Sequence, residues 1–185
     1  MKLSFIGADH VVTGSCHYLN IGDKHILVDY GMEQGSIAFE HAELPVSAAE
    51  IDYVLLTHAH IDHSGNLPLL YARGFRGKIF MTRPTADLCN IMLRDCAHIQ
   101  MQEAEWRSRK GKRNKNIKQI EPLYTMEDAD NTLRHIVPCE YNQKIDIPYS
   151  QEPEVVTYND SNYEEKLAQV QRKRAQGYYI VLKHE

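Results

Sequence analysis

Four potential metal ligands lie within six residues of one another, in the stretch YVLLTHAHIDHSG that runs from Tyr53 to Gly65. They are His58, His60, Asp62 and His63, and imidazole and carboxylate are the usual zinc ligands where thiolates are absent. In an extended segment His58 and His60 can point to one side, and a bend then brings Asp62 and His63 to the same region. A histidine-rich surface loop would explain any one of these histidines, but we favour a metal site for the four together.

The elements around this stretch are expected to be strands first and then alternating strands and helices. Tyr53–Thr57 is apolar and is predicted to be a strand buried on both faces. Further strands are expected at Leu3–Ile6, Cys16–Ile21, His25–Tyr30, Lys78–Thr82, Gln143–Ile147 and Tyr178–Lys183. Helical segments are expected at Ser47–Glu50, at Asn66–Arg73, from Pro84 to about Trp106, from Thr125 to near His135, and at Glu164–Gln176.

Composition is ordinary for a globular protein. The 185 residues suit one domain or a large fragment of one, with 43% hydrophobic and 25% charged residues. A net charge of -4 argues against a global attraction to nucleic acid or membrane. No apolar stretch approaches the roughly 20 residues of a membrane helix, and the four cysteines show no disulfide pattern. We therefore expect a soluble, cytoplasmic protein with reduced thiols and no membrane partner.

Two segments near the middle of the chain are explained by structural roles. The run Arg107–Lys118 holds seven basic residues and no acidic one; it could contact RNA phosphates, but we favour a solvated loop. Apolar residues recur at helical spacing after Pro84, which predicts that they form a buried stripe: Cys89, Met92, Cys96 and Ile99. Five other histidines are expected to be surface or packing residues rather than ligands: His10, His17, His98, His135 and His184.

The H-x-H-x-D-H pattern after a strand resembles the signature of the metallo-β-lactamase superfamily. Three other stretches resemble its β-CASP branch, the RNA-processing nucleases: GADHVVTGSCHYLN (Gly7–Asn20), ILVDYGMEQG (Ile26–Gly35) and EPLYTMEDAD (Glu121–Asp130). The resemblance covers about residues 1–147. H-x-H-x-D-H alone would indicate the superfamily, whereas the four stretches together are specific for the branch.

The resemblance implies an α/β fold, layered as an αββα sandwich with the metal site at one edge. Two zinc ions about 3.5–4 Å apart would bridge a hydroxide, with His58 and His60 on the first ion and Asp62 and His63 on the second. Asp62 would also orient the attacking water, and Asp29 would orient the ligands by hydrogen bonds. The alternative for Asp29 is an ordinary aspartate at the end of a strand. The implied reaction is hydrolysis of RNA phosphodiester bonds.

The sequence departs from the family after residue 147. A G-H-x-x-G-S-type motif should supply a further histidine there, yet the chain contains no Gly-His pair. We therefore expect residues 1–147 to be the N-terminal part of a metallo-β-lactamase domain, and residues 148–185 to be a divergent tail with one helix and one strand. The β-CASP insertion is expected to be absent. On this interpretation the chain comes from a truncated gene, a shifted reading frame or a natural remnant.

These expectations leave more than one function open. The first is a truncated zinc-dependent hydrolase of RNA, with one zinc or partial occupancy in an incomplete site. The alternative is a catalytically silent metal-binding or interaction remnant; a hydrolase of thioesters or lactams is disfavoured by the β-CASP-like stretches. A sandwich that lacks elements exposes apolar surface. We therefore expect self-association, with Tyr178–Lys183 completing a sheet in a neighbour. The sequence assigns no substrate-binding residue.

Overall fold

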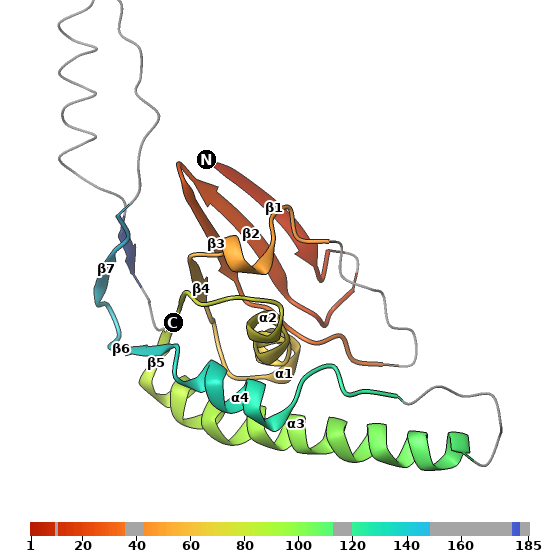
Figure 1. Cartoon of the computed structure of the whole chain (residues 1–185). Coiled ribbons are helices and arrows are strands. Elements are labelled where there is room, and N and C mark those ends of the chain that lie inside the picture. The colour runs from red at the N-terminus through yellow and green to blue at the C-terminus, as the bar shows by residue number, and fades with distance from the viewer. Residues whose placement is uncertain (10, 36–42, 113–119, 149–178, 182–185) are drawn as a thin grey trace, which may run out of the picture.

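The computed structural model describes residues 1–9, 11–35, 43–112, 120–148 and 179–181, which are built around a six-stranded sheet (Figure 1). The strands follow the order β1-β2-β3-β4-β5-β6 and span Lys2–Gly7, Cys16–Ile21, Lys24–Val28, Tyr53–Leu55, Lys78–Thr82 and Ile136–Cys139. β1, β2 and β3 are antiparallel neighbours, whereas β3 to β6 run parallel. The sheet is therefore mixed, with an antiparallel edge on a parallel half.

The helices cover one side of this sheet, with the long α3 outermost and α1 and α2 between it and the strands (Figure 1). Their bounds are Ile61–Ser64 for α1, Leu67–Ala72 for α2, Arg83–Lys112 for α3 and Met126–Leu133 for α4. A short 3₁₀ turn, η1, spans Ala48–Glu50 and precedes β4. The helical layer therefore packs against the same sheet that carries the H-x-H-x-D-H segment.

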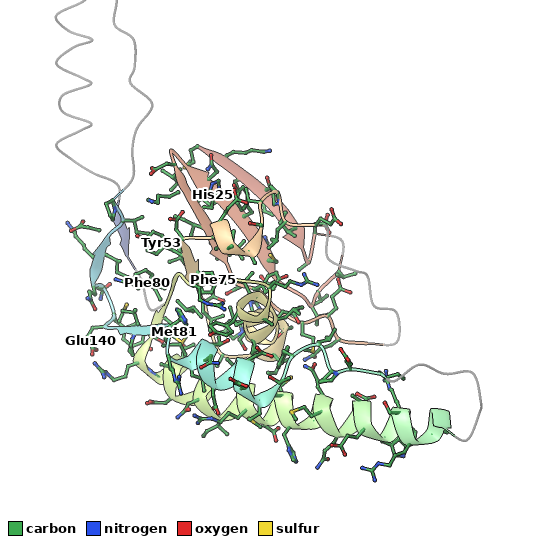
Figure 2. The ribbon with its side chains drawn as sticks, viewed as in Figure 1. His25, Tyr53, Phe75, Phe80, Met81 and Glu140 are labelled. Atoms are coloured by element: carbon green, nitrogen blue, oxygen red, sulfur yellow. The ribbon has the colours of Figure 1, made fainter. Side chains whose placement is uncertain are left out.

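Successive residues of the central strands are buried on opposite faces of the sheet. Val54 in β4 belongs to the core that packs against the helices, together with Phe75 after α2. Leu55 and Phe80 point the other way, into a separate cluster with Ile145 of β7. Figure 2 shows Phe80 toward β7, and Phe75 and Met81 on the helical side. Burial on both faces explains why these strands are continuously apolar in sequence.

The layered α/β fold class is confirmed, with the helical layer and one sheet of the expected αββα sandwich in place. Within the described residues, the only other sheet consists of β7 (Lys144–Asp146) and β8 (Tyr179–Val181). The strand β6 was missing from the sequence prediction because it contains Pro138, which cannot donate to a ladder. Proline is tolerated here because β6 is an edge strand of the sheet.

Helix α3 differs from the prediction in its length and in its buried stripe. It continues past Trp106 to Lys112, and Glu103 and Glu105 pair with the arginines four residues on, which supports the extra turn. The prediction that Ile99 belongs to the core is wrong, since 54% of this residue is exposed. Of the other predicted stripe residues, Cys89 is fully buried, and Met92 and Cys96 are partly buried against core residues. The fully buried positions Cys89, Leu93 and Ala97 are four residues apart, and Ile99 lies about 200° around the helix from Ala97.

The C-terminal tail is described only at Pro148 and at β8. The predicted helix Glu164–Gln176 lies outside the described residues, as do the remaining positions of the tail. The predicted terminal strand is present as Tyr179–Val181, and it pairs with β7 of the same chain. No helix in the described ranges combines the length and apolar character needed to cross a membrane.

A buried tyrosine connects the outer helices to the H-x-H-x-D-H segment. Tyr124, which is 2% exposed, donates its hydroxyl hydrogen bond to the Gly65 carbonyl at 2.8 Å, and its oxygen also lies 3.1 Å from Cys96 Sγ. Burial raises the pKa of Tyr124, and the hydrogen bond with Cys96 raises it further, so the phenol remains protonated and able to donate. The EPLYT stretch thus fixes the end of the histidine segment 59 residues away.

We expect Tyr124→Phe to lower the free energy of unfolding by about 1–3 kcal/mol, because the buried Gly65 carbonyl loses its donor. Urea unfolding followed by circular dichroism measures the change. Leu123→Ala is a matched control, since Leu123 is the adjacent residue and is 59% exposed; it should change stability by less than about 0.5 kcal/mol. Equal stability of Tyr124→Phe and the wild type would show that this hydrogen bond does not hold the segment.

Candidate metal centre

The four predicted ligands lie at the carboxyl ends of the parallel strands. Asp29 directly follows β3, and Thr57 follows β4 by two residues, so both side chains start from the same edge of the sheet. The chain then runs through His58 to His60, the N-cap residue of α1, and α1 itself carries Asp62 and His63. The expected bend is therefore a four-residue helical turn, which brings the second pair of ligands back toward the first.

Carbonyl groups along this segment accept hydrogen bonds from backbone amides of two earlier parts of the chain, one just before β2 and one after β3. Ile61, Asp62 and His63 each accept a hydrogen bond at 2.8–2.9 Å, and the donors are the amides of Met32, Ser15 and Tyr30 respectively. These bonds fix the positions from which the ligating side chains project.

Gly31 makes this close approach possible. A Cβ atom at Gly31 would lie 1.7 Å from the Asp62 carbonyl oxygen, which is backbone and cannot move aside. The position therefore requires glycine, and any larger residue would push the ligand segment away from the loop.

The Asp29 carboxylate is the polar centre of the site. It is 2% exposed and accepts hydrogen bonds from the Thr57 amide at 2.8 Å, from the Thr57 hydroxyl at 2.9 Å and from the Ser15 hydroxyl at 3.1 Å. Its Oδ2 atom also lies 2.7 Å from His63 Nδ1. Asp29 adopts a left-handed backbone conformation with φ 60°, which is uncommon for a residue other than glycine. Such a strained, buried and fully engaged carboxylate suits a positioning role better than that of an ordinary aspartate at a strand end.

The structure brings the predicted ligands together as two pairs. His58 Nε2 lies 3.2 Å from His60 Nδ1, and His63 Nε2 lies 3.6 Å from Asp62 Oδ2. The His58 ring links the pairs, with centroid distances of 4.7 Å to the His60 ring and 4.0 Å to the His63 ring. All four side chains therefore face one small region at the end of the sheet.

The spacing within each pair fits zinc. With zinc–ligand distances of about 2.0–2.1 Å and tetrahedral angles, two donors on one ion lie about 3.3–3.4 Å apart. The two observed separations, 3.2 and 3.6 Å, bracket this value. In the described part of the chain, however, no three His, Cys, Asp or Glu side chains are arranged to hold one ion. The four predicted ligands thus form two separate pairs.

Electrostatics keep His58 available as a ligand. Burial lowers the pKa of His58, and the neighbouring His63 and His60 rings lower it further. The neutral imidazole, which is the metal-binding form, is therefore favoured at neutral pH.

Other candidate ligands are engaged elsewhere or protonated. Burial, with the nearby Asp29 carboxylate as a smaller cause, raises the pKa of Cys16 to about 12, so its thiol does not supply a thiolate. His98 bonds to Gln102 on α3, and His135 Nδ1 bonds to the Gly77 carbonyl. His17 packs edge-on against Phe5. His10 and His184 lie outside the described residues.

The basic run is only partly described, and its described arginines are paired. Arg107 bonds to Glu103 and Arg109 to Glu105, which lowers the net positive charge of the end of α3. Lys110 stacks over the Trp106 ring at 4.7 Å. Residues 113–119 of the run lie outside the described ranges. The described part is thus helical, with its two arginines paired to glutamates, and not the loop that the sequence suggested.

Sequence reasoning missed three residues that hold the site together. Ser15 and Thr57 donate to Asp29, and Tyr124 holds the Gly65 carbonyl. Ser15 and Tyr124 are far from the H-x-H-x-D-H segment in sequence and carry no metal-ligand signal. Thr57 is adjacent to His58, so its hydroxyl could have been predicted from the sequence to lie at the site.

Comparisons with known proteins identify a family. A family model described as the metallo-beta-lactamase superfamily matches residues 11–75. Ribonuclease TTHA0252 of Thermus thermophilus is 37% identical over 144 residues, covering 77% of this chain and 29% of that protein. The transcription termination factor FttA of Methanocaldococcus jannaschii is 31% identical over 150 residues, covering 80% of this chain and 21% of that protein. The chain thus spans less than a third of the length of either relative.

Solved structures show more distant likenesses. MEM-A1, a subclass B3 metallo-beta-lactamase from a soil metagenome library, is 14% identical with a TM-score of 0.44, covering 78% of this chain and 46% of that chain. ST1585 of Sulfolobus tokodaii, an archaeal metallo-beta-lactamase superfamily protein, is 21% identical with a TM-score of 0.41. The overlap covers 78% of this chain and 50% of that chain. At these scores the overlaps carry no argument about function. The family match over residues 11–75 and the relatives that align over 144 and 150 residues place this part of the chain in the metallo-β-lactamase superfamily, in its β-CASP branch.

Proposed function

We propose that the chain contributes the first ligands of a zinc-dependent centre that hydrolyses RNA phosphodiester bonds. The observation that carries the proposal is the pair of donor sets, each at zinc spacing and both organised around Asp29. The relatives named as ribonucleases support RNA as the substrate class. A nuclease-related function follows from the family, whereas zinc and the cleavage activity of this chain are the proposal.

Each of the described site residues would have a separate role in this reaction. His58 Nε2 and His60 Nδ1 would hold one zinc, and His63 Nε2 and Asp62 Oδ2 a second. When bound, zinc would lower the pKa of water and polarise the phosphoryl oxygen. Asp62 has a second carboxylate oxygen, which would accept a hydrogen bond from the attacking water and so orient it. Asp29 would keep the His63 ring fixed in the ligating orientation.

A catalytically silent metal-binding module is the second candidate. It is favoured by one observation, that no described set of three donors faces a single ion. Two protein donors per ion would hold zinc weakly, or would share one ion in a makeshift site with four ligands. Both candidates predict metal binding, so cleavage distinguishes them.

Metal content and RNA cleavage, measured on the same purified chain, test both candidates. We expect zinc to bind, and a fluorescent RNA to be cut in a reaction that a chelator stops. His60→Ala should reduce cleavage to the level of the chelated protein, because one donor pair is lost. His98→Ala is the matched control, since His98 is a histidine on the exposed side of α3 and should leave both measurements unchanged.

The outcomes separate the candidates clearly. Zinc binding that His60→Ala weakens, without RNA cleavage in the wild type, would support the silent module. Cleavage that survives His60→Ala would contradict the proposed role of this cluster. No zinc binding by the wild type would overturn both.

Self-association remains a prediction and has a concrete test. Large apolar side chains are exposed on β1 and α3, and each is at least half exposed: Leu3, Phe5, Leu88, Ile91, Ile99 and Trp106. Exposed apolar surface of this kind favours contacts between copies. We expect light scattering to give a mass above that of one 21.3 kDa chain. A monomer at micromolar concentration would contradict the prediction.

A further inference from the structure

We propose that Thr57 is a positioning residue, whose hydroxyl connects Asp29 to His58 and fixes the His58 tautomer that can bind metal through Nε2. The inference rests on the proposed function, since it concerns how this chain prepares its ligands. It is carried by the hydrogen-bond partners around one hydroxyl group. Thr57 Oγ1 lies 2.9 Å from both Asp29 oxygens, 3.1 Å from His58 Nδ1 and 3.4 Å from His63 Nδ1.

The direction of these bonds follows from what each group can donate. An aspartate carboxylate only accepts hydrogen bonds, so the single hydroxyl proton of Thr57 must be donated to Asp29. If that proton pointed at His58 instead, lone pairs on Thr57 and on both Asp29 oxygens would face one another at 2.9 Å. Thr57 Oγ1 is therefore left as an acceptor. The nearby His58 Nδ1 must then carry the proton that it donates to Thr57.

The consequence falls on the opposite nitrogen of the His58 ring. With the proton on Nδ1, His58 Nε2 presents a lone pair, and this is the atom that lies 3.2 Å from His60 Nδ1. In the metal-free chain His60 Nδ1–H can donate to that lone pair. Metal binding then requires a proton change only at His60, because His58 already has its ligating tautomer.

The same carboxylate acts on the other donor pair without an intermediary. Asp29 Oδ2 lies 2.7 Å from His63 Nδ1, which places the proton on Nδ1 and leaves Nε2 toward Asp62. Asp29 thus sets the tautomer of one histidine in each pair, His63 directly and His58 through Thr57. A single buried charge prepares both metal positions.

A packing role does not account for Thr57. The residue is exposed, and its amide bond to Asp29 does not require the side chain. Thr57→Val keeps the shape and removes only the hydroxyl, whereas Thr57→Ser keeps the hydroxyl and removes a methyl group. Since the residue is exposed, neither variant opens a core cavity.

The experiment reads the tautomers directly, in the metal-free, ¹⁵N-labelled chain. Long-range proton–nitrogen correlation spectra distinguish Nδ1–H from Nε2–H imidazoles, and His58→Gln identifies the His58 signals. We expect His58 to be Nδ1–H in the wild type and in Thr57→Ser. In Thr57→Val we expect a shift toward Nε2–H. His63 should remain Nδ1–H, because its 2.7 Å contact with Asp29 is much shorter than its 3.4 Å contact with the Thr57 hydroxyl.

Zinc affinity gives a second readout, measured by competition with a chromophoric chelator. Thr57→Val should weaken binding about 10–100-fold, and Thr57→Ser by no more than about threefold. Thr125→Val is the matched control, since Thr125 is also exposed and also donates its hydroxyl to a carboxylate, that of Asp128. It should change neither the His58 tautomer nor the affinity.

The wild-type spectrum alone can contradict the proposal, so the test does not depend on a stable variant. An Nε2–H His58 in the wild-type chain would overturn the proposal, and so would a tautomer that Thr57→Val leaves unchanged. Failure of the proposed function would look different. A chain in which Thr57→Val shifts the tautomer, but which binds no zinc, would retain the Thr57 connection and refute the metal centre.

Discussion

The buried Asp29 carboxylate is the constraint on which the rest of the site depends. A charge that is 2% exposed is costly unless it is surrounded by donors, and here donors come from three parts of the chain. Ser15 reaches it from the start of β2, Thr57 from the end of β4, and His63 from α1. Satisfying this one group therefore fixes the relative positions of two strands and the ligand-bearing turn.

A backbone framework complements this side-chain centre. The carbonyls of the ligand segment are bound by amides of the loop around Gly31 and, at the far end, by the Tyr124 hydroxyl. The framework depends on close approach at Gly31, where any Cβ atom would collide with the Asp62 carbonyl. The helical layer and the loop thus hold the turn from two sides. Ligands on such a turn can be ordered before metal arrives, which reduces the entropic cost of binding.

The sequence predicted most of the elements, and the clustering of the four candidate ligands, because these signals are local. Lys78–Thr82 and Cys16–Ile21 were predicted with the bounds observed, and α4 begins at Met126, one residue after the predicted start at Thr125. The failures lie where long-range packing decides. Pro138 argued against a strand at β6, and only the sheet order shows that β6 is an edge strand, where proline is tolerated. Ile99 was assigned to the core from its helical spacing, but the buried face of α3 does not include it.

What the sequence determined by itself was the chemistry: His58, His60, Asp62 and His63 in a spacing typical of a metal-binding turn, with Asp29 in its own stretch. Only the tertiary structure decided how they work together. It arranged the four predicted ligands as two pairs, with separations of 3.2 and 3.6 Å, and placed Asp29 against His63. It also identified Thr57, Ser15 and Tyr124 as supports. The physical reason is that these hydrogen bonds join residues 14 to 59 positions apart. Such residues meet only when the backbone has folded, so a local sequence pattern does not indicate which of them will pair.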